Sequence, residues 1–543
     1  MKKYILPTLT VLAAAIGIVV GMALSQKANA QRIVYQNGSW QFQQTKVDRL
    51  LQLMESAYVD DLNIDSITDE AMTELVQKLD PHSAYIPKED LEMVNSELSG
   101  SFSGIGVQFT IQQDTVRIVA VIAGGPSEGV GVLAGDKLIT VDDSAFVGKK
   151  MNNEKVMKTL RGPKGTKVKL GILRAGMKEP LAFTVTRGDI PVTSVDAKFI
   201  IEPTANANAK ANAKIGFIRV NKFGETTYKE FISALADLSA KGANSFIVDL
   251  RENSGGYMEQ AIRMANEFLQ RGNLIVYSEG RAYPRYEANA NGGGRFKETP
   301  LVVLIDNFSA SASEIFAGAM QDNDRATIVG RRSFGKGLVQ QQMPFDDGSA
   351  VRLTVARYYT PSGRCIQKPY TLGHQEDYEK DLMERWEHGE FYSADSIHFA
   401  DTTAYYTKGG RKMYGGGGIM PDVFVGRDTS LNTPWYNQCV NLAYTYQFAY
   451  QYTDKHRKEL SQFKDWQALE RYLLKQNILP QFVAFAQEKG VEPNKEEIAK
   501  SKPLITRLLN AYIVRNILGD DGFFPLFERD DEITKKAVEV LSK

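Results

Sequence analysis

Three serines, at positions 309, 311 and 313, alternate with alanines directly after an apolar stretch typical of a buried strand. Small residues follow at helical spacing, so Ser311 is expected near the start of a helix. A helix N-terminus has unpaired N–H groups and partial positive charge, which stabilise an oxyanion. Two interpretations stay open at this point: Ser311 is a nucleophile, or these serines only cap the helix.

A nucleophilic serine needs a base. The five histidines all lie outside residues 215–357, and the chain has no Gly-x-Ser-x-Gly elbow. A lysine can take the proton instead when burial lowers its pKa toward neutrality. Lys336, between Gly335 and Gly337, is the candidate, and the alternatives are a solvated turn residue or a phosphate-binding lysine.

The phosphate-binding alternative fails on one residue. Residues 330–337 nearly match a Walker A loop, but Gly337 stands where that loop needs a serine or threonine to bind magnesium. Nucleotide binding is therefore not favoured.

The elements around these residues alternate between strand-like and helix-like patterns, which indicates an α/β core. The strand-like stretches are apolar throughout, so the sheet is expected to be covered on both faces. Strands are expected at residues 215–220, 246–250 and 301–305, and helices at 227–240, 258–270 and 311–320.

The rest of the chain has other hydrophobic patterns. Residues 40–98 have helical periodicity, and residues 100–188 have short β-rich runs between glycine turns. Residues 203–214 are of low complexity and are expected to form an exposed loop. After residue 430, apolar residues recur at helical spacing, so residues 431–543 are predicted to form a helical domain.

Composition excludes several classes of protein. The 543 residues include 65 Lys and Arg against 65 Asp and Glu, so no basic surface for nucleic acid is indicated. Only Cys365 and Cys439 are present, which excludes a disulfide scaffold and gives no metal-ligand spacing. No metal or cofactor is expected.

The N-terminus has the pattern of an export signal. Two lysines precede an uncharged apolar run at residues 4–24, and Ala28-Asn29-Ala30 resembles a signal-peptidase site. The run is also long enough to cross a bilayer, so cleaved signal and retained membrane anchor both stay open. Either way the body is expected in the bacterial envelope, as a periplasmic protein.

Several motifs in the same order resemble the carboxyl-terminal processing, or tail-specific, serine peptidases. The resemblance covers roughly residues 40–425 and implies an α/β serine-peptidase core with crotonase-like ββα character. The segments that carry it are 80–83, 249–256, 309–315, 317–322, 333–340, 359–364 and 418–422.

Carried over by motif position, the resemblance implies roles for single residues. Ser311 is the nucleophile, Lys336 the general base, and Gln340 the residue that orients the lysine. Family members also have an acidic residue at the position of Asp322. A carboxylate beside Lys336 would keep the lysine protonated, so a structural part is favoured for Asp322.

The implied oxyanion hole combines the Ala312 amide with one from Gly255 or Gly256. Glycine suits this position because the backbone can approach a substrate carbonyl closely, although a plain turn is the alternative. Ser254 departs from the proline or glycine common in the family, so the choice between the two glycines stays open.

A second resemblance concerns peptide capture. Gly104, Ile105, Gly106 and Val107 resemble the carboxylate-binding loop of PDZ domains, and residues 135–139 resemble their second signature. Backbone N–H groups of such a loop bind a C-terminal carboxylate while the peptide adds a strand. Arg161 is a lesser candidate for coupling peptide capture to the peptidase site, against the alternative of a solvated arginine.

The expected protein is an exported serine endopeptidase that recognises free apolar C-termini of protein substrates. A non-catalytic PDZ scaffold and a crotonase-type acyl-transfer enzyme are the alternatives. Helices at either end of the chain are candidate dimerisation surfaces. The predicted domains are 1–30 (signal or anchor), 31–98 (helical), 99–188 (PDZ), 189–430 (peptidase core) and 431–543 (helical).

Overall fold

The computed structural model describes residues 33–36, 39–42, 45–96, 98–112, 114–122, 124–133, 135–174, 176–203, 214–398 and 401–543. The predicted signal or anchor and most of the low-complexity segment lie outside these residues. Within them, no helix combines the length and apolarity needed to cross a membrane. The chain divides into two compact units, residues 1–75 and 76–543.

The first unit begins with a hairpin rather than a helix. β1 (Ile33–Gln36) pairs antiparallel with β2 (Ser39–Phe42). These residues fall in the predicted helical region 31–98, so the prediction is wrong for them. The predicted helices follow as α2 (Lys46–Ala57) and α3 (Ile64–Gln77), which ends just inside the second unit.

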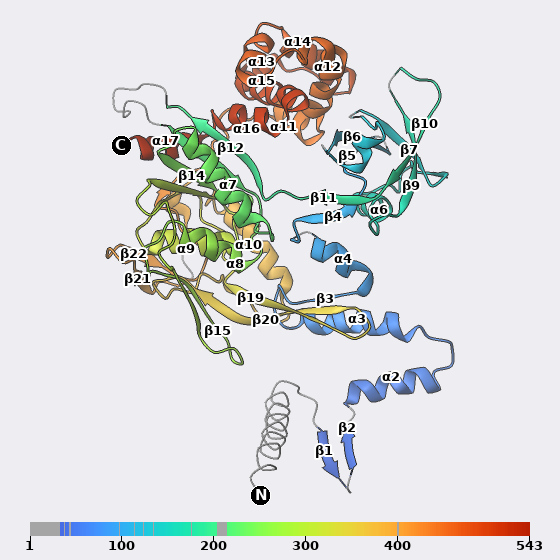
Figure 1. Ribbon diagram of the computed structural model, residues 1–543, viewed down its shortest axis with the longest axis vertical. Coiled ribbons are helices and arrows are strands. Elements are labelled where there is room, and N and C mark those ends of the chain that lie inside the picture. Colours follow the sequence, from blue (N-terminus) through green and yellow to red (C-terminus); the bar gives the residue numbers. More distant parts are fainter. Residues whose placement is uncertain are drawn as a thin grey trace, which may run out of the picture. The chain divides into compact units, whose positions relative to one another are not determined.

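The β-rich region lies where it was predicted. Its main sheet has the strand order β10-β9-β7-β6-β5, with β8 on β7, so β5 is an outer strand (Figure 1). β4 pairs with β11, which brings the entry and exit of the region together. The bounds are β4 (Ser101–Gly104), β5 (Val107–Gln112), β6 (Thr115–Val121), α5 (Pro126–Gly129), β7 (Lys137–Val141), β8 (Ser144–Ala145), α6 (Asn153–Leu160), β9 (Lys167–Leu173), β10 (Leu181–Thr186) and β11 (Gly188–Pro191).

The predicted α/β core is built on a sheet with the order β12-β13-β14-β17-β18-β23, parallel from β13 onward. Apolar side chains of three helices, α7, α8 and α9, pack against one face. The bounds are β12 (Val195–Ile201), β13 (Ile215–Val220), α7 (Thr227–Ala240), β14 (Ser245–Asp249), α8 (Met258–Asn266), β17 (Leu301–Ile305), α9 (Ala312–Asp322), β18 (Thr327–Gly330) and β23 (Val423–Phe424).

The other face of this sheet is covered by the end of the chain. Ile533 and Ala537 of α17 (Glu532–Ser542) pack among Phe217, Val302 and Leu304. The expectation of a sheet covered on both faces is therefore confirmed. The covering helix comes from the predicted C-terminal domain, which periodicity alone did not indicate.

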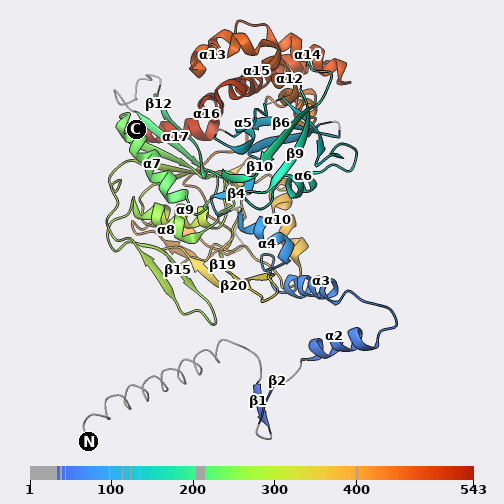
Figure 2. The ribbon, with the colours of Figure 1, turned by 45° about the vertical axis from the view of Figure 1, so that its right-hand side comes forward.

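A second sheet lies beside the core, with the order β16-β15-β20-β19 (Figure 2). A three-residue strand, β3 (Ala84–Ile86), adds to β20 within the predicted helical region 31–98. Flanking prolines Pro81 and Pro87 prevent a helix there. The other bounds are α4 (Lys88–Ser96), β15 (Leu274–Glu279), β16 (Tyr286–Asn289), β19 (Leu338–Pro344) and β20 (Ala350–Tyr359).

The C-terminal helices before α17 share a core of their own, which includes Trp435, Phe448 and Phe482. Figure 1 draws α12 to α15 as one orange and red cluster. An insertion with α10 (Gln375–Glu387), β21 (Ala404–Tyr406) and β22 (Lys412–Tyr414) precedes it. The helices are α11 (Pro434–Asn441), α12 (Tyr444–Leu460), α13 (Trp466–Leu473), α14 (Ile478–Glu488), α15 (Lys495–Leu518) and α16 (Asp520–Glu528).

Candidate active site

The start of α9 gives the three serines different environments. Ser309 and Ser313 are fully buried, and their hydroxyls donate to the carbonyls of Leu250 (2.8 Å) and Asn253 (2.9 Å). Ser311, directly before the helix, is only partly buried. The flanking serines therefore hold the loop structure together, and Ser311 is the one that a substrate can reach.

Ser311 has a backbone conformation that residues with a side chain rarely adopt, with φ 56° and ψ −114°. Gly255 packs directly against it: a Cβ on Gly255 would lie 2.7 Å from the Cβ of Ser311 and 3.0 Å from the nitrogen of Ala312. A Cβ on Gly256 would lie 2.2 Å from the carbonyl oxygen of Phe223. Both positions therefore require glycine for close backbone approach.

The amides around Ser311 differ in their partners. The N–H of Gly255 donates to Oδ1 of Asn253 at 2.9 Å. Within the part of the chain that the structure describes, the N–H groups of Gly256 and Ala312 have no hydrogen-bond acceptor. Of the two glycines named from the sequence, Gly256 is thus the one whose amide is available to a ligand.

Lys336 lies in the loop before β19, and its Nζ donates to Oε1 of Gln340 at 3.0 Å. Burial and the charge of Arg352 lower the pKa of Lys336, while the carboxylates of Glu314 and Asp80 act in the opposite direction. A lowered pKa increases the share of neutral amine, the form that accepts a proton.

Gln340 is itself held by a distant segment. Its Nε2 donates to the carbonyl of His82. The Asp80 carboxylate fixes that segment, because it accepts from the His82 N–H (3.0 Å), from the Ser83 hydroxyl (2.6 Å) and from the Thr354 hydroxyl (3.0 Å). Sequence reasoning singled out residues 80–83 only as a family segment, and the structure brings them to Gln340.

The imidazole of His82 has a different partner. Its Nε2 lies 2.9 Å from the hydroxyl of Tyr378 on α10. Burial, followed by the charge of Lys336, lowers the pKa of His82 to about 4. The ring is therefore neutral near pH 7 and adds no positive charge beside the lysine.

Glu314, in the first turn of α9, was missed by the sequence analysis. Its carboxylate accepts from the N–H groups of Ser311 (2.8 Å), Lys336 (2.8 Å) and Gly335 (2.7 Å), and from the Ser333 hydroxyl (2.5 Å). Burial raises the pKa of Glu314 to about 7, and these four donors favour the ionised form. The Ser-x-x-Glu spacing of a capping box was the available signal.

Tyr358 was also missed. Its buried hydroxyl lies 3.1 Å from the carbonyl oxygen of Ser311 and 2.5 Å from that of Lys336. Together with Glu314, it joins the main chain at Ser311 to the main chain at Lys336. Two segments that are far apart in sequence are thereby held side by side.

Asp322, at the end of α9, is fully engaged away from Lys336. It forms a buried ion pair with Arg364 (2.6 Å) and accepts from the N–H (3.1 Å) and the hydroxyl (2.6 Å) of Ser362. These contacts agree with a structural part for Asp322.

The loop from Gly104 to Val107 joins β4 to the outer strand β5. Ile105 is buried, and Gly106 has φ 75°, a conformation that favours glycine. The carbonyl of Ile105 accepts from the Ser127 N–H at 3.0 Å. The loop therefore stands at the end of a strand whose outer edge can accept a peptide.

Arg161, at the C-terminal end of α6, is not a freely solvated arginine. Its guanidinium lies 4.2 Å from the ring centroid of Phe102, and Nη1 donates to the hydroxyl of Ser96 at 3.3 Å. Its contacts are with β4 and α4, the elements that lead into the β-rich region.

Within the described residues, no cluster of three or more His, Cys, Asp and Glu has the arrangement of a metal site.

Comparison with protein families divides the chain into matched regions. Residues 214–379 match the model of peptidase family S41, and residues 103–185 match the PDZ domain. Residues 435–519 match a family of unknown function, DUF8443.

Curated relatives carry protease names. The carboxy-terminal-processing protease of Bartonella bacilliformis is 34% identical over 322 residues, which are 59% of this chain and 71% of the relative. The carboxy-terminal processing protease CtpA of Bacillus subtilis is 35% identical over 340 residues, 62% of this chain and 70% of the relative. A solved photosystem II D1 C-terminal processing protease is 25% identical, covering 70% of this chain and 92% of its own, with a TM-score of 0.37.

Proposed function

The chain belongs to the carboxy-terminal processing proteases, a group of serine-type peptidases with a PDZ domain, and we propose that it cleaves peptide bonds with a Ser311/Lys336 dyad. One observation carries this proposal. Glu314 and Tyr358 tie the backbones of Ser311 and Lys336 together, while Gln340 holds the lysine amine.

In the proposed reaction, neutral Lys336 accepts the proton of the Ser311 hydroxyl as the oxygen attacks the scissile carbonyl. The resulting ammonium gives this proton to the leaving amine, and an acyl-enzyme ester stays on Ser311. Water, deprotonated by the same lysine, then attacks the ester, and the lysine ammonium returns this proton to the Ser311 oxygen as the new carboxyl terminus is released. Gln340 orients the amine throughout these steps.

The oxyanion formed in each step is proposed to accept from the amides of Ala312 and Gly256. Both lack an acceptor in the described part of the chain; Ala312 follows Ser311 in sequence, and Gly256 follows Gly255, which packs on Ser311. The amide of Gly255 already donates to Asn253, so Gly255 contributes by allowing close packing instead. Fixed donors aimed at a developing charge are a large catalytic term.

Substrate selection is proposed to use the PDZ domain. A free C-terminal carboxylate would bind the backbone N–H groups of the loop from Gly104 to Val107, with the tail added as a strand along β5. Arg161 contacts the elements that enter this domain and is proposed to couple peptide capture to the peptidase site. Apolar tails are the proposed preference.

The proposed location is the bacterial envelope. Lys2 and Lys3, the apolar run at 4–24 and the Ala28-Asn29-Ala30 site support export, either with cleavage or as a retained anchor. Envelope proteins would then be the substrates for processing or degradation. The terminal helices stay candidates for a dimer interface.

The test is mass spectrometry of the products from residues 31–543 incubated with an unfolded protein whose apolar tail is free or amidated. We expect cleavage of the free-tail substrate, weaker cleavage of the amidated one, and none by Ser311→Ala. Cleavage that persists in Ser311→Ala would contradict the assigned nucleophile. Equal cleavage of both tails would contradict carboxylate capture.

The second candidate is a PDZ scaffold with an inactive peptidase body. Binding of the free tail without any cleavage, in a chain that folds normally, would favour it over the enzyme.

A further inference from the structure

Arg251, in the loop after β14, is bonded to acidic groups of two segments that are far apart in sequence. Its guanidinium makes two 2.8 Å hydrogen bonds to Asp249, at the end of the same strand. Its other donors reach Glu528 (2.7 Å) and Asp531 (2.8 Å), between α16 and α17. Arg251 and Glu528 are buried, so these are charge-assisted bonds in a place of low water content.

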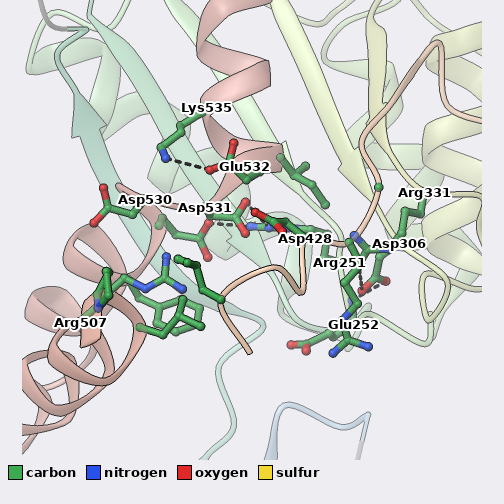
Figure 3. A pocket seen from close by; sticks show the side chains of 18 of the residues that line it. Arg251, Glu252, Asp306, Arg331, Asp428, Arg507, Asp530, Asp531, Glu532 and Lys535 are labelled. Atoms are coloured by element: carbon green, nitrogen blue, oxygen red, sulfur yellow. Dashed lines mark hydrogen bonds and ion pairs between the residues drawn. The ribbon is translucent and has the colours of Figure 1, made fainter. Parts of the chain in front are cut away.

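The two C-terminal acids are themselves fixed. Glu528 accepts from the hydroxyl of Thr534 at 2.7 Å, and Asp531 accepts from the Thr534 N–H at 2.9 Å as the cap of α17. Arg251 and Asp531 are among the residues that line a cavity of about 680 Å³. Both are labelled in Figure 3. Glu528 and Asp531, each oriented by Thr534, therefore direct two carboxylates at the guanidinium of Arg251.

Arg251 belongs to the loop of residues 250–256, which packs on the nucleophile. The carbonyl of Asn253 accepts from the Ala310 N–H (3.0 Å) and from the Ser313 hydroxyl (2.9 Å), on either side of Ser311. Gly255 lies against Ser311 itself. A displacement of this loop would move the amide of Gly256 relative to the nucleophile.

The loop also contains strain that its surroundings must hold. Glu252 has φ 60°, a left-handed conformation that a residue with a side chain adopts at a cost. Its N–H donates to Asp306 (3.0 Å), and its carboxylate pairs with Arg219 (2.7 Å). Such a conformation persists only where neighbouring contacts fix it, and Arg251 is the adjacent residue.

We propose that Glu528 and Asp531 are positioning residues for the peptidase reaction: through Arg251 they hold loop 250–256 in the geometry in which the Gly256 amide faces the oxyanion. This role rests on the proposed function of Ser311. It gives the end of the chain a part in catalysis as well as in covering the sheet.

The physical basis is that Arg251 keeps its two bonds to Asp249 when the C-terminal acids are neutralised, so the residue stays buried and charged. The bonds that fix its other side then run to neutral amide oxygens and become weaker, so the loop gains freedom. A misplacement of about 1 Å at a reacting group can lower the rate about a hundredfold. Substrate binding at the distant PDZ loop would not change.

The experiment compares Glu528→Gln and Asp531→Asn with the wild type and with a matched control, Glu470→Gln. Glu470 is also a buried acid of the C-terminal helices, but both of its oxygens accept from Arg529, at 2.7 and 2.9 Å, and not from Arg251. Three quantities are measured: kcat and KM for a free-tail peptide, the thermal unfolding midpoint, and hydrogen exchange of the amides in residues 250–256.

We expect kcat to fall at least about tenfold in both test variants, with KM within about twofold. Amides of loop 250–256 should exchange faster, and the control should match the wild type in both respects. Unchanged exchange in the test variants overturns the proposal, even if the wild type cleaves nothing. Faster exchange with unchanged kcat also overturns it, while loss of activity in Ser311→Ala separately tests the proposed function.

Discussion

At the scale of single residues, the chemistry depends on how the charges around Lys336 balance. Burial and Arg352 favour the neutral amine, whereas Glu314 and Asp80 favour the ammonium. The carboxylate of Glu314 accepts from three main-chain N–H groups and from the Ser333 hydroxyl, and these donors stabilise its charge where it lies. A carboxylate beside the proposed base is therefore compatible with a lowered pKa of the lysine.

Replacement of the proposed base gives the first prediction. Lys336→Ala should lose at least about a thousandfold in kcat, because the group proposed to accept the serine proton is removed. The fold should persist, since the main chain at position 336 keeps its bonds to Glu314 and Tyr358. Peptide turnover and circular dichroism check this, and unchanged turnover would remove Lys336 as the base.

The pH dependence of the peptidase activity gives the second prediction. Activity needs neutral Lys336, so kcat/KM should rise with pH as the lysine loses its proton. Arg352→Gln removes a positive charge that lowers the pKa of Lys336. The rise should therefore move to higher pH in this variant, because the ammonium is then less disfavoured.

The control is Arg285→Gln, which removes a charge that does not act on Lys336. A pH profile measured on the same peptide should coincide with that of the wild type. If Arg352→Gln moved the rise to lower pH, the proposed protonation state of the base would be wrong.

At the scale of elements, the start of α9 organises the site. The helix presents its first N–H groups beside Ser311, and Glu314 from its first turn reaches across to the loop that carries Lys336. β19 and β20 hold that loop from the other side through Gln340 and Tyr358. The Glu314 carboxylate and the Tyr358 hydroxyl thus connect the start of α9 to the loop that leads into β19.

Glu314→Gln tests this arrangement. The amide offers one accepting oxygen in place of two, so two donors among the four lose their partner. We expect kcat to fall by about a hundredfold and the free energy of unfolding by about 2–4 kcal/mol. Peptide kinetics measure the first effect, and hydrogen exchange of the α9 amides measures the second.

The matched control for that variant is Glu230→Gln. Glu230 also accepts from two main-chain N–H groups, those of Ser194 (2.7 Å) and Val195 (2.9 Å), but it does not contact Ser311 or Lys336. Stability should fall here as well while kcat is kept. An equal loss of kcat in both variants would reduce Glu314 to a general stabilising role.

At the scale of the whole chain, the C-terminal helix completes the α/β core. Ile533 and Ala537 fill the far face of the sheet, and Glu528 and Asp531 reach the loop beside Ser311. The predicted helical domain therefore divides: α11 to α16 share a core that also includes Ala197 of β12, and α17 belongs to the sheet. The region that matches DUF8443, residues 435–519, ends before Glu528.

Ile533→Ala tests how far the core sheet depends on its contact with α17. Truncating a buried isoleucine costs about 2–5 kcal/mol. Because several domains unfold in this chain, hydrogen exchange of the β17 amides is the suitable measurement. Those amides should lose protection, whereas Leu474→Ala, at a side chain that is 60% exposed, should leave them unchanged.

The sequence by itself determined the local elements and the candidate residues. β13, α7 and β17 begin and end at the predicted residues, because hydrophobic periodicity and turn signals act over a few positions. Ser311, Lys336 and Gln340 were named from motifs, and Lys336 and Gln340 are close enough in sequence to meet on one strand edge.

Only the tertiary structure decided which groups surround those residues. The His82 carbonyl meets Gln340 across 258 positions, and Glu528 meets Arg251 across 277. No periodic pattern encodes such pairs, because they depend on how separate elements pack. The choice of Gly256 over Gly255 for the free amide follows from a bond of Asn253 to the Gly255 N–H, and the Asn253 carbonyl is in turn held by Ala310 and Ser313 across about 60 positions.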